Sequence, residues 1–219
     1  MKKTKYSVAI FDMDGTILDT LQDLTDSVNF ALEENGFAKR SLEEVRTFVG
    51  NGVEKLVERA VPENTPFQNI QRVLDTFNGY YTNHCALKTK PYDGIVELLK
   101  NLKNSGFKVA VVSNKPDYGV KSLCSQYFDG IFDSAAGIKD GTNPKPSPDT
   151  VNRILEILGC EKKSAVYIGD SDVDIMTAKN AGIKCISVNW GFKTKEFLIA
   201  NGATEIVDTC EELFKCLTK

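Results

Sequence analysis

The sequence has little of several residue types on which common functional classes depend. It holds a single histidine, His84, which ends a run of residues at helical spacing and is expected to be structural, so histidine catalysis is not predicted. Its six cysteines are scattered without a CxxC pair, which is typical of reduced thiols and not of a disulfide framework or a zinc site. No apolar run approaches the roughly 20 residues of a membrane span, and none resembles a secretory signal. A cytoplasmic location without a membrane partner is therefore expected.

The chain also has no excess of positive charge. The 219 residues carry a formal net charge of -3, so no overall positive field exists to attract nucleic acid, and no nucleic-acid partner is expected. Hydrophobic residues make up 42% of the chain and charged residues 26%, as in ordinary soluble enzymes with a packed core. An anionic substrate would therefore have to be held by local groups.

A block of helical pattern occupies the first part of the chain. Between residues 19 and 88 apolar side chains recur at helical spacing, and no segment there shows a strand signal. Two capping boxes are predicted at helix starts, Thr20 with Asp23 and Ser41 with Glu44. The segment is therefore expected to be all-helical.

Strands and helices alternate in the rest of the chain. Strands are predicted at residues 6–11, 107–112, near Ile131, 165–168 and 185–188. This alternation predicts an α/β fold with a Rossmann-like parallel sheet and helices on both faces. The helical block interrupts it after the first strand. The expected domains are thus a catalytic core of residues 1–18 and 89–219 and a small, inserted, all-helical cap of residues 19–88.

Polar clusters fall at the carboxyl edge of the predicted sheet, where ligands bind in such folds. The four clusters are Asp12-Met13-Asp14-Gly15-Thr16, Ser113-Asn114-Lys115, Lys145-Pro146-Ser147-Pro148-Asp149 and Gly169-Asp170-Ser171-Asp172-Val173-Asp174. Each alone has an ordinary explanation, because Asp-Gly forms turns, Lys-Pro-Ser-Pro can start a helix and Gly-Asp-Ser-Asp can cap one. Their coincidence at one sheet edge favours a functional site.

The charges in these clusters suit phosphoryl transfer. Asp12 and Asp170, brought together from neighbouring strand ends, would repel each other unless a cation lay between them, and their oxygen ligands suit magnesium. With Lys145 offsetting more of the charge, a phosphate dianion could approach Asp12 as the nucleophile. Ser113 could hold phosphoryl oxygens, and Asp14 could protonate the leaving group and then deprotonate a water.

The clusters resemble the signature motifs of the haloacid dehalogenase superfamily: DxDGT, a hydroxyl residue after a core strand, a lysine and GDxxxD. The resemblance covers essentially the whole chain, includes a helical cap after the first motif and is closest to the phosphoglycolate phosphatase group. It implies that Asp12 is the nucleophile and Asp14 the acid and base. The implied substrate-binding residues are Ser113, Asn114 and Lys145. The implied Mg²⁺ ligands are Asp12, the backbone carbonyl of Asp14 and Asp170, with Asp174 as a supporting carboxylate.

The resulting hypothesis is a magnesium-dependent phosphatase that hydrolyses small phosphate monoesters, foremost 2-phosphoglycolate, through a phospho-aspartate on Asp12. Dehalogenases of the superfamily lack the second aspartate of the first motif and phosphonate-cleaving relatives have alanine there, so Asp14 favours phosphoester cleavage. Two alternatives stay open, a phosphosugar mutase of the same superfamily and a phospho-accepting signalling module. The expected partner is a small phosphate ester, and the protein is expected to be a monomer or a dimer.

Two further features have a structural or an open interpretation. Trp190 and Phe192 follow a predicted strand and are expected to serve packing. The segment Gly50-Asn51-Gly52 is either the cap loop that faces the active site or an ordinary turn between helices.

Overall fold

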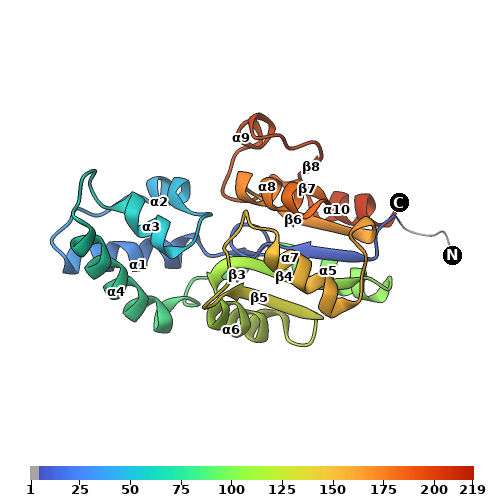
Figure 1. The fold of residues 1–219 in the computed structure, drawn as a ribbon, viewed down its shortest axis with the longest axis horizontal. Coiled ribbons are helices and arrows are strands. Elements are labelled where there is room, and N and C mark those ends of the chain that lie inside the picture. The colour runs from blue at the N-terminus through green and yellow to red at the C-terminus, as the bar shows by residue number, and fades with distance from the viewer. Residues whose placement is uncertain (1–4) are drawn as a thin grey trace.

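The computed structural model describes residues 5–219 as an α/β core with a block of helices at one end (Figure 1). The first four residues of the predicted core lie outside the described residues. The core contains a six-stranded sheet in the order β5-β4-β1-β6-β7-β8, and every neighbouring pair is parallel. Its strands are β1 (Val8–Phe11), β4 (Lys108–Pro116), β5 (Ser134–Ile138), β6 (Ala165–Gly169), β7 (Lys184–Val188) and β8 (Ile206–Val207).

Helices cover both faces of this sheet. They are α5 (Ile95–Asn104), α6 (Asp117–Phe128), α7 (Asp149–Leu158), α8 (Asp172–Ala181) and α10 (Cys210–Thr218). The short helix α9 (Lys195–Ala200) lies between β7 and β8, and a short 3-10 turn at Lys162–Ser164 precedes β6. Ala9 and Phe11 of β1 belong to a hydrophobic cluster with α5, α6 and α10, whereas Val8 and Ile10 pack with α7 and α8. Successive side chains of a strand point to opposite faces, so β1 must be apolar throughout. The predicted parallel α/β fold is confirmed.

The helical block has a hydrophobic cluster of its own. It consists of α1 (Leu21–Glu34), α2 (Leu42–Phe48), α3 (Val53–Ala60) and α4 (Phe67–His84). Within the described residues, Phe192 is the buried member of this cluster that comes from the core. The chain enters and leaves the block through two short antiparallel strands, β2 (Leu18–Asp19) and β3 (Lys90–Pro91), which the sequence pattern does not predict. This paired crossing holds the two ends of the block side by side.

The strand predicted near Ile131 is wrong by several residues. Ile131 lies in the turn after α6, and the edge strand β5 begins at Ser134. Its sequence, SAAGI, has small side chains and little of the β-branched signal that marks a strand. One reason for small residues is close packing, since a Cβ on Gly137 would lie 2.4 Å from the backbone oxygen of Lys115.

One of the two predicted capping boxes forms. The Ser41 hydroxyl accepts a hydrogen bond from the Glu44 N–H, and the Glu44 carboxylate accepts one from the Ser41 N–H at 2.8 Å. The box predicted for Thr20 and Asp23 is wrong, because Thr20 is the N-cap of α1 but makes no side-chain cap bond. Asp23 is instead buried and turns away from the helix start, towards the chain that returns to the core.

Asp23 fastens that returning chain. Its carboxylate accepts hydrogen bonds from the backbone N–H groups of Lys88 and Thr89, at 2.9 and 2.8 Å, and from the Thr89 hydroxyl at 2.8 Å. A buried carboxylate is stable only when its oxygens are paired, so these contacts satisfy Asp23 and fix the crossing together.

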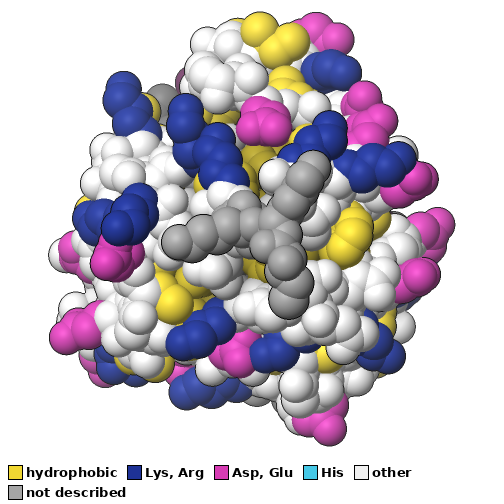
Figure 2. All heavy atoms as spheres, turned by 90° about the vertical axis from the view of Figure 1, so that its right-hand side faces the viewer, with side chains coloured by type: hydrophobic (Ala, Val, Ile, Leu, Met, Phe, Trp, Pro, Cys, Tyr) yellow, Lys and Arg dark blue, Asp and Glu magenta, His cyan; other side chains and the backbone are white. Residues whose placement is uncertain are grey.

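The surface carries charges of both signs. On the face of the core opposite the helical block, basic and acidic side chains are interspersed, which agrees with the small net charge (Figure 2). Among residues 5–219 no helix is long and apolar enough to cross a membrane.

Replacing Asp23 by alanine should lower the free energy of unfolding by about 3 kcal/mol, because the buried N–H and hydroxyl of Thr89 and the partly buried N–H of Lys88 would lose their acceptor. Denaturant titration of the purified variant measures this directly. Asp26→Ala is the matched control on the same helix, since Asp26 makes an exposed ion pair with Lys88 and should contribute less than about 1 kcal/mol. Equal effects of the two substitutions would show that Asp23 does not fasten the crossing.

Candidate active site

A pocket between the helical block and the carboxyl edge of the sheet collects nearly all the predicted site residues. From the core it is lined by Asp12, Asp14, Ser113, Asn114, Lys115, Lys145, Asp170, Ser171, Phe192 and Lys193. From the helical block it is lined by Leu24, Val49, Gly50, Gly52, Val53 and Leu56. Polar groups thus form its base and mostly apolar groups its roof.

Three carboxylates converge at the base of the pocket. Asp12, Asp170 and Asp174 are all buried, and each offers an oxygen within 4.8 Å of the others. Burial raises the pKa of Asp12 well above its ordinary value, and the neighbouring Asp174 raises it further. Burial and Asp174 likewise raise the pKa of Asp170 to about 7. The group therefore carries more negative charge than its surroundings neutralise.

Lys145 is the cation that holds this centre together. Its Nζ lies 2.8 Å from Asp12 Oδ1, 2.7 Å from Asp174 Oδ1 and 3.1 Å from the Tyr167 hydroxyl. Burial alone would lower the pKa of Lys145, but Asp12 and Asp174 raise it well above its usual range. The lysine therefore stays charged between the two carboxylates.

Asp174 lies at the start of α8 and has partners on both oxygens. Oδ2 accepts hydrogen bonds from the Ser171 hydroxyl at 2.6 Å and from the Ser171 N–H at 3.1 Å, and Oδ1 faces Lys145. The Ser171 hydroxyl in turn accepts from the Asp174 N–H, which completes a capping box. Asp174 is therefore placed to orient Lys145, as expected of a supporting carboxylate.

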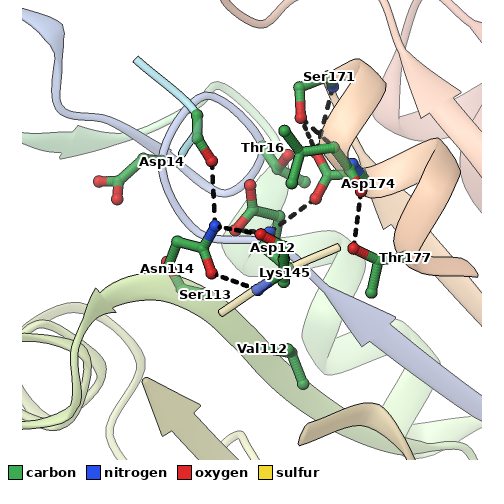
Figure 3. Close-up of polar contacts among 12 residues, drawn as sticks. Asp12, Asp14, Thr16, Val112, Ser113, Asn114, Lys145, Ser171, Asp174 and Thr177 are labelled. Carbon is green, nitrogen blue, oxygen red and sulfur yellow. Dashed lines mark hydrogen bonds and ion pairs between the residues drawn. The ribbon is translucent and has the colours of Figure 1, made fainter. Parts of the chain in front are cut away.

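The backbone of Lys145 is fixed by Asn114. The Asn114 side-chain oxygen accepts from the Lys145 N–H at 2.7 Å, and its amide nitrogen donates to the Lys145 carbonyl at 3.1 Å (Figure 3). The same nitrogen lies 3.3 Å from the carbonyl of Gly50 in the helical block. Because these bonds occupy the side-chain amide of Asn114, they favour a role in positioning Lys145. The direct substrate contact that the sequence predicts for Asn114 stays a prediction.

The Ser113 hydroxyl is open to the pocket. Its oxygen accepts from the Lys115 N–H at 3.2 Å, and the side chain is buried beside Asp12 among the lining residues. Because that bond uses the oxygen as acceptor, the hydroxyl hydrogen can still donate to an anion.

Asp14 points away from Asp12 and the acidic centre (Figure 3). Its Oδ1 lies 3.0 Å from the Nζ of Lys115. Lys115 is buried and also contacts the hydroxyl of Tyr81, which comes from α4 of the helical block. Asp14, the predicted acid and base, is thus held by Lys115. In the sequence this lysine belongs to the Ser113-Asn114-Lys115 cluster, but no role is predicted for it there.

Asp170 is held in place by groups from two other segments. The Thr16 hydroxyl donates to its Oδ1 at 3.1 Å, and the backbone N–H of Phe192 donates to its Oδ2 at 2.7 Å. Both donors leave lone pairs of the carboxylate available, as a metal ligand requires.

The sequence comparison agrees with this geometry. A family model described as haloacid dehalogenase-like hydrolase matches residues 9–188, which is more than half of the chain. The chain belongs to the haloacid dehalogenase-like hydrolase family. The family membership, the fold class and the hydrolase class that the sequence predicts are therefore confirmed.

Relatives within the family match along most of the chain. Phosphoglycolate phosphatase 1 of Pseudomonas aeruginosa is 31% identical over 215 residues, which cover 95% of this chain and 79% of that protein. The phosphoglycolate phosphatase of Aquifex aeolicus is 36% identical over 186 residues, covering 84% of this chain and 85% of the relative. The solved structure of a proposed phosphoglycolate phosphatase from Lactobacillus delbrueckii subsp. bulgaricus superposes with a TM-score of 0.94 at 42% identity, covering 98% and 99% of the two chains.

The loop Gly50-Asn51-Gly52 faces the pocket with its two glycines but not with the side chain of Asn51. Gly50 and Gly52 line the pocket, so the loop faces the site of this family member. The side-chain oxygen of Asn51 instead accepts a hydrogen bond from Arg59 at 2.8 Å, and Asn51 is not among the lining residues. A ligand would therefore meet the backbone of this loop.

Gly191 is a site residue that the sequence motifs do not reveal. A Cβ at this position would lie 2.3 Å from Asp170 Cβ and 2.5 Å from the Gly15 carbonyl oxygen. Only glycine therefore lets the loop after β7 approach Asp170 closely enough for the Phe192 N–H to bond it. Trp190 and Phe192 pack as predicted, and Gly191 between them allows the close approach to Asp170.

Gly191→Ala should displace Asp170 and reduce kcat/KM for small phosphate esters by roughly 100-fold, the usual penalty of a misplacement near 1 Å. Steady-state assays with a series of small phosphate esters would measure the loss. The matched control is Gly79→Ala, since a Cβ there meets nothing within 4 Å and alanine suits its helix. Wild-type activity in folded Gly191→Ala would contradict the role assigned to this glycine.

Proposed function

We propose that this protein is a magnesium-dependent phosphatase that hydrolyses small phosphate monoesters through a phospho-aspartate on Asp12. The observation that carries the proposal is the buried Asp12 carboxylate, which lies 2.8 Å from Lys145 and beside Asp170 at the base of the pocket. A carboxylate in this position can attack an anionic phosphate only because neighbouring positive charge offsets the repulsion.

The proposed reaction has two displacements. An oxygen of Asp12 attacks phosphorus while the ester P–O bond breaks, and Asp14 acts as the general acid that gives a proton to the departing alkoxide. A water then gives a proton to Asp14 and attacks the same phosphorus, which releases inorganic phosphate and restores the Asp12 carboxylate. Ser113 and Lys145 hold the phosphoryl oxygens in both steps, and Asp14 must turn from Lys115 towards the ester oxygen.

The acidic centre fits magnesium by the chemistry of its donors. Its oxygen-only set and excess negative charge match the preferences of this hard cation. Asp12, the Asp14 carbonyl and Asp170 would hold the ion. When bound, Mg²⁺ would offset the charge of the carboxylates and of the phosphoryl oxygens.

The size of the pocket favours a small substrate. The cavity between helical block and core has a volume of only about 40 Å³. The named relatives are phosphoglycolate phosphatases, which makes 2-phosphoglycolate the first candidate substrate. In this proposal residues 19–88 act as a cap that excludes water, and residues 1–18 and 89–219 form the catalytic core. The cytoplasmic location and the monomeric or dimeric state stay predictions.

Asp12→Asn should abolish turnover, because an amide is a poor nucleophile and a weaker metal ligand. The measurement is phosphate release from 2-phosphoglycolate, with circular dichroism to establish the fold. Asp140→Asn is the matched control, since Asp140 is exposed in a turn away from the pocket, and it should behave as wild type. Wild-type kcat in folded Asp12→Asn would overturn the proposed mechanism.

Chelation should remove the activity, and added Mg²⁺ should restore it. Asp170→Ala should raise the Mg²⁺ concentration needed for half-maximal activity by at least about 10-fold. Loss of a residue that only supports a metal ligand already weakens metal binding by about this factor, and loss of a ligand should weaken it at least as much. Magnesium titration of both proteins after dialysis against chelator gives the two values. Full activity in excess chelator would exclude the metal site as proposed.

A further inference from the structure

Lys115 is a buried cation of the pocket that the proposed phosphoryl chemistry does not use. Its side chain is 3% exposed, compared with 15% for its partner Asp14. The ammonium group also contacts the Tyr81 hydroxyl and lies 4.9 Å from the centre of the Tyr81 ring. Lys115 is thus paired with one carboxylate and one neutral phenol.

The other two lysines of the pocket have fixed tasks. Lys145 bridges Asp12 and Asp174 at the acidic centre. Lys193 donates to the backbone carbonyl of Thr47 at 3.0 Å, near the C-terminal end of α2, and so joins core and helical block. Lys115 alone among the three has a partner that the reaction requires to move.

That movement would leave a buried charge without a counter-ion. Asp14 must leave Lys115 when it turns towards the ester oxygen. An unpaired buried ammonium is unfavourable, because the pocket cannot solvate it as water does. A ligand that brings its own monovalent anion would compensate for the loss, and a ligand without one would leave Asp14 tied to Lys115.

We propose that Lys115 is the specificity-determining residue that binds the carboxylate of a carboxylated phosphate monoester. The substrate carboxylate takes the place of Asp14 on the ammonium group, with the Tyr81 hydroxyl as a second donor. Asp14, freed from this ion pair, takes up a proton from solvent and then donates it to the departing ester oxygen. The proposal rests on the proposed function and adds the substrate class to it. Tyr81 belongs to α4, so recognition of the carboxylate also depends on the helical block being closed over the core.

A carboxylate suits this position better than a second phosphate. Lys115 offers one positive charge, which matches a monovalent anion, and the surrounding lining residues Leu24, Val53 and Leu56 offer no further charge. The cavity volume of about 40 Å³ also favours a substrate in which the two anionic groups are close together. 2-Phosphoglycolate is a small ester of this class.

The test compares two esters that differ in this group, 2-phosphoglycolate and 2-hydroxyethyl phosphate. Wild type should prefer the carboxylated ester in kcat/KM by roughly 30-fold or more, the value of a buried charge-assisted pair. In Lys115→Met this preference should fall to within a few-fold. The ratio cancels any effect of the substitution that is common to the two esters, such as partial loss of folded enzyme.

Lys121→Met is the matched control. Lys121 lies on α6, is 63% exposed and pairs with Asp117 outside the pocket, so its loss should leave the preference intact. Lys115→Arg keeps the charge and should retain part of the preference. Tyr81→Phe keeps the ring but removes the hydroxyl, and should reduce the preference less than Lys115→Met does.

Inhibition by glycolate gives a readout that does not depend on how each ester reacts. Glycolate should inhibit hydrolysis of 2-hydroxyethyl phosphate by wild type and by Lys121→Met, and its inhibition constant should rise by at least about 10-fold in Lys115→Met. If Lys115→Met unfolds, Lys115→Arg and Tyr81→Phe still test the proposal through the same two ratios.

The outcomes separate this inference from the proposed function. Hydrolysis of both esters without a preference for 2-phosphoglycolate, or with equal losses for both in every Lys115 variant, would overturn the role of Lys115 and leave the phosphatase standing. Hydrolysis of neither ester by wild type with Mg²⁺ would overturn both proposals.

Discussion

Three buried carboxylates converge at the carboxyl edge of the sheet around a single ammonium group, which pairs with two of them, and the rest of the site depends on this arrangement. Lys145 bridges Asp12 and Asp174, while Asp170 is held by neutral donors and has a pKa of about 7. Such crowding opposes folding, because buried charges lose their hydration. The Asn114 side chain supports the arrangement, because it bonds the backbone of Lys145 and so fixes the position of the lysine. The negative charge that Lys145 leaves uncompensated suits the binding of a cation together with a phosphate ester.

The helical block is coupled to this centre by contacts of different strength. Asp23 fixes the chain that returns to the core through hydrogen bonds from the backbone N–H groups of Lys88 and Thr89. Phe192 packs into the cluster of the block while its N–H bonds Asp170. Lys115, which lines the pocket, joins Asp14 to Tyr81 of α4. A movement of the block would therefore change the surroundings of the acid and base, which links closure to chemistry in physical terms.

Sequence reasoning found the parts of the site that have local signals. Asp12 and Asp170 each follow an apolar run that can only be a buried strand, and parallel strands bring such ends to one edge. The contact of Lys115 with Tyr81 joins two segments 34 positions apart, and neither segment carries a pattern that predicts it. The need for glycine at position 191 likewise comes from its close approach to Asp170 and Gly15, which no local sequence pattern predicts. The edge strand β5 was misplaced because its small side chains lack strand propensity, although close packing requires them.

The central claim is that the phosphoryl group passes through Asp12, and chemical trapping tests it most directly. The enzyme would be mixed with 2-phosphoglycolate and Mg²⁺, quenched within one turnover and treated with borohydride, which reduces an acyl phosphate to an alcohol. Mass spectrometry of the digested protein then locates the reduced residue. The account predicts reduction at Asp12, at a level that rises and decays with turnover. Reduction at another carboxylate, or turnover at the full rate with no reduced Asp12 at any quench time, would contradict it.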